Sequence, residues 1–166
     1  MNIFEFAMDK EKYSELYYRD LAQRSTSAGL KSILIMLADQ EAEHYRTMEH
    51  MKAGTPRAVA DTPVLGSAKR IFEKMRKAAE KVDFHAGEVD LYRKAAKIEE
   101  ESKRFYNQKA EEATDPVHKE ILRKLAQEED KHLLLMDSLL SFVSRPETYL
   151  EDAEFSHIDD YVEEGF

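Results

Sequence analysis

Two short stretches of this chain combine apolar, acidic and imidazole side chains in the same order. LADQEAEH occupies positions 37–44 and LAQEEDKH occupies positions 125–132. In each stretch the Glu and the His lie three residues apart, so a helix would present both on nearly the same face as the preceding Leu-Ala pair. A carboxylate turned towards a protein interior needs a partner for its charge. The two repeated Glu-x-x-His pairs are Glu41/His44 and Glu129/His132.

Both stretches belong to a longer internal repeat. Residues 7–48 and 95–136 are related by an offset of 88 positions and share 14 identities in 42. An arbitrary alignment of two helical segments would give roughly two to four identities. Each copy also contains a Glu followed seven residues later by a Tyr, which two helical turns place on one face. These further pairs are Glu11/Tyr18 and Glu99/Tyr106.

The repeated polar residues predict a dinuclear metal site. Four carboxylates that meet inside a bundle repel one another and lose solvation, so some of them would stay protonated. Two divalent cations would neutralise four negative charges, and two neutral imidazoles would complete the donor set. A lone Glu-x-x-His is common on a solvated helix face, but two copies with two Glu-x6-Tyr pairs at a shared offset favour metal binding. The candidate ligands are Glu11, Glu41, His44, Glu99, Glu129 and His132.

The elements that must position these residues are predicted to be four long helices in two antiparallel hairpins. A polar stretch at 24–29 separates the first two helices, and Asp115-Pro116 starts the last one. The long connection 54–86 contains an amphipathic helix predicted over 67–82. Two hairpins with a long crossover predict an all-α, ferritin-like four-helix bundle over 1–145, followed by a tail over 146–166. The four predicted helices span about 2–23, 28–53, 87–113 and 115–144.

Composition excludes several classes of function. The chain has no cysteine, which excludes disulfides, thiolate nucleophiles and cysteine-bound metal sites. A net charge of -9 argues against a nucleic-acid partner. The first residues do not resemble a signal peptide, and the longest apolar run, 33–38, is too short to span a membrane. We therefore expect a soluble cytoplasmic protein without a membrane partner.

At these motifs the chain resembles the rubrerythrin branch of the ferritin-like superfamily, over about 2–143. The motifs are A-x3-E-x6-Y, which starts at Ala7 and Ala95, and LA-x2-E-x2-H in both hairpins. The resemblance implies that the six candidate ligands hold two metal ions. It implies that Glu41 and Glu129 bridge them, that Glu11 and Glu99 each bind one, and that Tyr18 and Tyr106 donate hydrogen bonds to ligand carboxylates.

The chain departs from the family pattern at three places. Without cysteine it has no rubredoxin-like iron site, so a reductase of this kind would need a separate redox protein as electron donor. Some rubrerythrins have a further ligand Glu where this chain has Ser102, and Glu100 is the alternative ligand. Bacterioferritins bind haem through a Met at the positions of Ala42 and Asp130, so we expect no haem.

The resulting prediction is a di-iron oxidoreductase that reduces peroxide or dioxygen under oxidative stress. Iron fits the carboxylate-rich donor set, with manganese and zinc as alternatives. Ferroxidase or iron-handling activity of the ferritin type, and a structural metal-bound bundle, are the competing functions. No catalytic residue is predicted beyond the metal site. The resemblance implies a homodimer or larger homo-oligomer, and the tail, with eight acidic residues, is predicted to pack through its aromatic rings or to form a docking surface.

Overall fold

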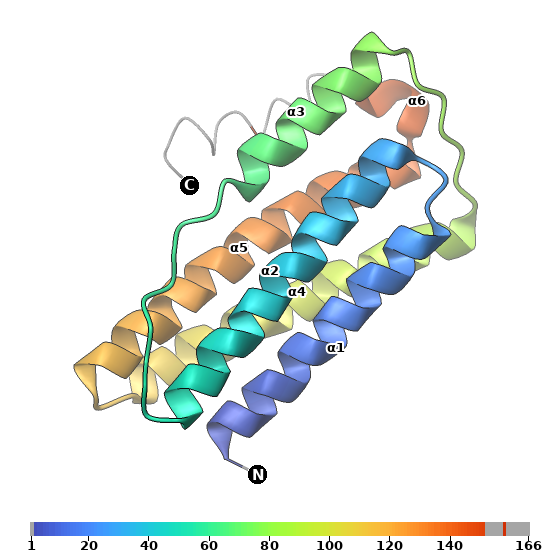
Figure 1. Cartoon of the computed structure of the whole chain (residues 1–166). Coiled ribbons are helices and arrows are strands. Elements are labelled where there is room, and N and C mark those ends of the chain that lie inside the picture. Colours follow the sequence, from blue (N-terminus) through green and yellow to red (C-terminus); the bar gives the residue numbers. More distant parts are fainter. Residues whose placement is uncertain (1, 152–157, 159–166) are drawn as a thin grey trace.

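The computed structural model describes residues 2–151 and residue 158, and this part of the chain contains six helices and no strand. Four long helices form the bundle, while α3 runs alongside α2 and α5 near one end of it and the short α6 follows α5 (Figure 1). The prediction of an all-α, ferritin-like bundle is confirmed. The bundle helices are α1 (Ile3–Arg24), α2 (Ala28–Lys52), α4 (Ala86–Glu112) and α5 (Pro116–Ser144), and the others are α3 (Val64–Lys77) and α6 (Pro146–Tyr149).

Side-chain caps fix where the bundle helices begin. Asn2 and Glu5 form a capping box at α1, in which the Glu5 backbone N–H donates to Asn2 Oδ1 at 2.9 Å. Ser27 accepts from the Leu30 backbone N–H at the start of α2. Asp115 accepts from two backbone N–H groups of α5, with proline in its first turn, as the sequence predicted. The short α1–α2 and α4–α5 loops make each pair of helices antiparallel (Figure 1).

The helix in the crossover differs from its predicted bounds of 67–82. It starts three residues earlier, at Val64, and ends five residues earlier, at Lys77. The reason for the early end is a Schellman motif. Ala79 has a positive φ of 49°, and the backbone N–H groups of Ala79 and Glu80 donate to the carbonyls of Arg76 and Met75. Phe72 and Met75 are buried against the bundle, as the apolar stripe predicted, but Ala78 and Ala79 are exposed.

The segment before α3 is fastened to α5 by a buried ion pair that the sequence pattern did not reveal. Lys131 Nζ lies 3.1 Å from Glu128 Oε1, and both side chains are buried. Thr62 Oγ1 donates to the other Glu128 oxygen at 2.5 Å, and Lys131 also reaches the Thr62 carbonyl. Asp61 pairs with Lys124 and Lys131. These contacts hold the crossover against the α5 turn that carries two of the candidate ligands.

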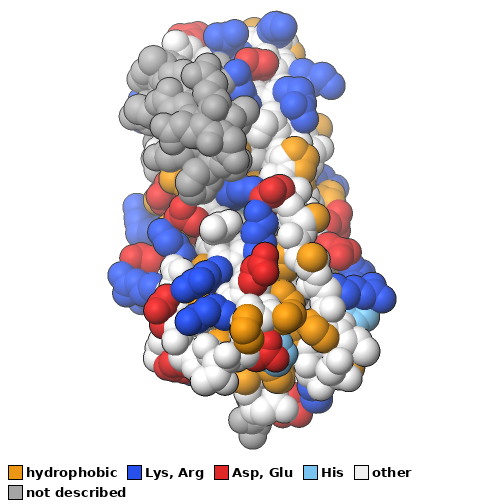
Figure 2. All heavy atoms as spheres, turned by 90° about the vertical axis from the view of Figure 1, so that its left-hand side faces the viewer, with side chains coloured by type: hydrophobic (Ala, Val, Ile, Leu, Met, Phe, Trp, Pro, Cys, Tyr) orange, Lys and Arg blue, Asp and Glu red, His pale blue; other side chains and the backbone are white. Residues whose placement is uncertain are grey.

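The face that carries the crossover has a mixed surface. Figure 2 shows Lys and Arg interspersed with Asp and Glu among the described side chains of this face, while hydrophobic side chains gather in its lower part. The described residues of this face therefore form no large patch that is uniformly positive or uniformly negative. No helix in the described part of the chain is long and apolar enough to cross a bilayer.

The core consists of two apolar clusters rather than one. The larger cluster includes Tyr18, Leu37, Phe72 and Phe142 and is covered by α3. The smaller cluster, at the opposite end of the bundle, includes Ala7, Met48, Tyr106 and Leu125. A layer of buried polar side chains lies between the two. The candidate ligands form this layer.

The start of the predicted tail packs on the larger cluster. Tyr149 in α6 is buried, and its ring lies 5.3 Å from that of Phe72 and 5.7 Å from that of Phe142. Edge-on and tilted contacts between aromatic rings of this kind stabilise a core. The other aromatic residues of the tail, Phe155, Tyr161 and Phe166, lie outside the described residues, so their predicted packing stays a prediction.

Candidate metal centre

All six candidate ligands meet in the middle of the bundle. One carboxylate comes from α1 and one from α4, while α2 and α5 each contribute a Glu and a His. None of the six residues is more than 2% exposed. Helical periodicity explains how each helix presents its residues on one face, and the hairpin connections turn those faces inward. The six residues are Glu11, Glu41, His44, Glu99, Glu129 and His132.

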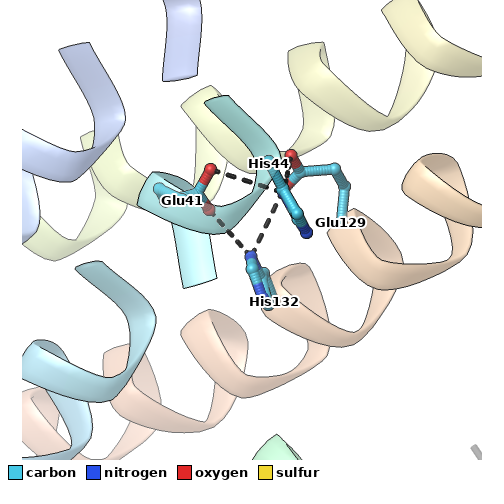
Figure 3. Close-up of side chains that lie close together, drawn as sticks. All are labelled: Glu41, His44, Glu129 and His132. Carbon is cyan, nitrogen blue, oxygen red and sulfur yellow. Dashed lines mark hydrogen bonds and ion pairs between the residues drawn. The ribbon is translucent and has the colours of Figure 1, made fainter. Parts of the chain in front are cut away.

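The inner part of the centre consists of two carboxylates and two imidazoles that interact across the hairpins. His44 Nδ1 lies 3.1 Å from Glu129 Oε1, and His132 Nδ1 lies 2.8 Å from Glu41 Oε1 (Figure 3). The two imidazole rings are stacked, with centroids 5.4 Å apart. One potential ligand atom from each of the four residues lies within 4.8 Å of the others. Each hairpin therefore supplies an imidazole that contacts a carboxyl group of the other hairpin.

The outer carboxylates are held by tyrosines of the opposite hairpin. Tyr18 on α1 donates a hydrogen bond to Glu99 Oε1 on α4, and Tyr106 on α4 donates one to Glu11 Oε1 on α1. The sequence repeat predicted that these tyrosines share a face with the glutamates, but not that the partners are exchanged between hairpins. One oxygen of Glu11 lies 3.8 Å from His44 Nδ1, so the outer carboxylates border the inner group. His132 Nδ1 and Glu99 Oε1 are separated by the same distance.

Burial gives three of the four carboxyl groups raised pKa values. Desolvation, followed by repulsion from Glu129, raises the pKa of Glu11 to about 7. The same two causes raise the pKa values of Glu41 and Glu99 well above the ordinary range. In the metal-free protein at neutral pH, Glu11 is therefore partly protonated, and burial favours the protonated forms of Glu41 and Glu99. The interior does not hold four uncompensated negative charges.

The fourth carboxyl group, Glu129, is the ionised member of the set. Burial alone would raise its pKa, but the charge of His44 and hydrogen bonds from His132 and His44 hold that pKa well below the ordinary range. For His44, burial opposes protonation, yet the charge and hydrogen bond of Glu129 raise its pKa to about 9. The metal-free centre therefore contains a buried imidazolium–carboxylate pair between α2 and α5.

The donor set fits two divalent cations. Glu99 Oε2 and Glu129 Oε2 are buried and form no hydrogen bond within the described part of the chain. Such atoms are costly unless something else satisfies them. Both imidazoles turn Nδ1 towards the carboxylates, so this nitrogen is the candidate ligand atom. Four carboxylates with two imidazoles match the composition of di-iron and di-manganese carboxylate sites in ferritin-like bundles.

The comparison with known families agrees with this arrangement. The family model described as Rubrerythrin matches residues 2–140. The chain belongs to the rubrerythrin family. Rubrerythrins are di-iron proteins, and the buried Glu/His group of this rubrerythrin could bind metal ions. No curated protein and no solved structure gave a match to the chain.

The structure also reveals residues of this rubrerythrin that sequence reasoning missed or misplaced. The alternative ligand Glu100 is exposed and pairs with Arg104 at 2.7 Å, so it does not face the centre. Ser102 is buried one turn beyond Glu99, and Ser14 occupies the equivalent position beyond Glu11. The serines are related by the same offset of 88 residues as the ligands, and this identity was the signal that could have identified them.

Proposed function

We propose that this protein is a di-iron oxidoreductase that reduces hydrogen peroxide with electrons from a separate donor. The observation that carries the proposal is the buried set of four carboxylates and two imidazole Nδ1 atoms, drawn from all four bundle helices. Membership of the rubrerythrin family supports the same proposal. Dioxygen is the second oxidant that this chemistry accommodates.

Each side chain has a distinct part in holding the metals. The rubrerythrin pattern implies that Glu41 and Glu129 would be shared by the two ions, and each of them contacts an imidazole of the opposite hairpin. The same pattern implies that Glu11 and Glu99 would each hold one ion. Tyr18 and Tyr106 fix the orientation of these outer carboxylates through their hydrogen bonds.

Bound iron would supply the two electrons that, with two protons, reduce one hydrogen peroxide to two waters, and two ferrous ions would thereby become ferric. The apolar clusters on either side of the centre keep bulk water from the ligands. Protonated glutamates would release their protons as the cations bind, since a ligand carboxylate must be ionised. Because the chain has no cysteine, electrons for the next turnover would come from an external redox protein.

The test begins with elemental analysis of protein purified without added metal. The protein is then loaded anaerobically with ferrous iron and mixed with hydrogen peroxide in a stopped-flow spectrometer, with and without a reduced electron donor. We expect two irons per chain, fast oxidation by one peroxide per pair and continued turnover only with the donor. Glu129→Gln is the matched variant, which should lose iron binding and oxidation together.

Two outcomes would overturn the proposal. Iron accumulating far beyond two ions per chain would indicate storage of the ferritin type. A tightly held zinc pair, with a ferrous form that peroxide does not oxidise, would indicate a structural metal site.

A further inference from the structure

We propose that a groove between α1 and α4 is the route by which hydrogen peroxide reaches the centre, and that Ser14 and Ser102 form its inner constriction. This inference rests on the proposed function, because it specifies how the substrate reaches that site. The groove has a volume of about 420 Å³ and is lined by α1 residues, including Phe6, Lys10 and Tyr13, and α4 residues, including Ile98 and Glu101, together with the two serines.

The position of the serines connects the groove to the ligands. Ser14 and Ser102 follow Glu11 and Glu99 by three residues, about one helical turn. They line the groove, yet Ser14 is only 3% exposed and Ser102 only 5%. Each serine therefore lies at the inner side of the groove, next to the turn that carries an outer carboxylate. A small side chain at both positions leaves space that a leucine would fill.

The chemistry of the serines suits a small polar molecule. Neither hydroxyl has a hydrogen-bond partner among the described residues, so both are free to donate to or accept from a passing molecule. The mouth of the groove carries Asp9 and Glu101 as well as Lys10. This mixture of charges gives no preference for an anion or a cation. Neutral hydrogen peroxide, which both donates and accepts hydrogen bonds, fits such a path.

The described residues cover the centre on its other sides. The two apolar clusters cover it towards both ends of the bundle. On the side of α5, the crossover is fastened by the buried contacts of Thr62, Glu128 and Lys131. Between α1 and α4, by contrast, the bordering positions are taken by the two serines. The inner side of the groove is therefore bordered by two small side chains, which leave room for a small molecule.

The test compares two double variants with a control. Ser14→Leu/Ser102→Leu fills the constriction, Ser14→Ala/Ser102→Ala keeps it open, and Ser32→Leu places the same bulk on the exposed face of α2. Ferrous-loaded protein is mixed with hydrogen peroxide and, separately, with nitric oxide, whose binding is followed by absorbance. Nitric oxide reports access without requiring turnover. Iron content and the melting temperature of metal-free protein are measured for every variant.

We expect the leucine variant to slow both reactions by about tenfold, equivalent to roughly 1.4 kcal/mol added to the entry barrier, with two irons still bound. The alanine and Ser32→Leu variants should bind nitric oxide at the wild-type rate. Wild-type rates in the leucine variant would overturn the proposal, as would equal slowing of nitric oxide in the alanine variant. If the double leucine variant does not fold, Ser14→Leu and Ser102→Leu are measured singly: slower nitric oxide binding in either would support the route, and wild-type rates in both would overturn it. If peroxide fails to oxidise even the wild type, the proposed function fails, while nitric oxide still tests the route.

Discussion

Replacing Glu11 by Gln should change the stability of the protein in opposite directions with and without metal. The side chain is buried and its pKa is raised from 4.5 to about 7, chiefly by desolvation. Its ionisation therefore opposes folding. The stability that this group gives the folded state is fully present below pH 4.5 and is lost as pH rises through 7.

The magnitude follows from the pKa shift. Between 4.5 and about 7 the difference is roughly two and a half units, and each unit is worth about 1.4 kcal/mol, so ionisation of Glu11 costs the metal-free protein about 3 kcal/mol at pH 8. Glutamine stays neutral at every pH and can still accept the Tyr106 hydrogen bond. Metal-free Glu11→Gln should therefore be more stable than wild type by up to about 3 kcal/mol at pH 8, and about equal at pH 4.5.

Urea unfolding at both pH values, with a chelator and then with saturating cobalt, measures this difference. With metal the sign should reverse, because the variant lacks an anionic ligand and gains less stability from binding. Glu100→Gln, at the exposed position that follows Glu99 on α4, is the control and should change stability by less than about 0.5 kcal/mol. If metal-free Glu11→Gln is no more stable than wild type at pH 8, the carboxylate is solvated and the reasoning is wrong.

Four further results are expected. Lys131→Met should lower the free energy of unfolding, measured in urea, by about 3 kcal/mol, because it leaves the buried Glu128 carboxylate without its cationic partner. Adding Glu128→Leu should restore most of that loss. If the effects of the two substitutions simply add, the pairing is contradicted. Ala79→Gly should raise the free energy of unfolding by about 1 kcal/mol, since glycine adopts the positive φ of 49° without strain; a less stable variant would argue against this helix end. Binding of two divalent cations at pH 7 should release more than one proton, because the pKa of His44 is about 9, that of Glu11 is about 7, and those of Glu41 and Glu99 are raised by burial. An indicator dye in weak buffer measures the release, and less than one proton would mean that these groups are not protonated in the metal-free centre. Tyr106→Phe should weaken metal affinity about tenfold, because Glu11 loses the hydrogen-bond donor that orients it. Competition with a chelator measures the affinity, and an unchanged value would show that this hydrogen bond does not orient a ligand.

Helix positions were predictable to within a few residues because their signals are local. The Asp115-Pro116 pair marked the start of α5, and the polar stretch at 24–29 separated α1 from α2. The crossover helix was the least accurate, because its apolar stripe continues through Ala78 and Ala79 although the backbone leaves the helix there. Alanine is a strong helix former, so a residue with positive φ at this position could not be foreseen.

The candidate ligands were predictable for a different reason. The offset of 88 residues repeats every one of them, so a pattern that is weak in one hairpin becomes specific in two. Functional and structural residues that the repeat does not duplicate were missed. The repeat does not duplicate Glu128 and Lys131, because the equivalent positions in the first copy are Gln40 and Glu43. Nothing in the repeat therefore indicated that Glu128 and Lys131 form a buried ion pair.

The amino-acid sequence by itself determined the four bundle helices, their pairing into hairpins and the inward face that carries four glutamates and two histidines. These features depend on caps, loop lengths and helical periodicity, all of which act over a few residues. Only the tertiary structure decided that Tyr18 donates to Glu99 and Tyr106 to Glu11, and that two serines lie beneath a groove between α1 and α4. Those contacts depend on how far one hairpin slides and rotates against the other, which is set by the packing of both apolar clusters together and not by any local segment.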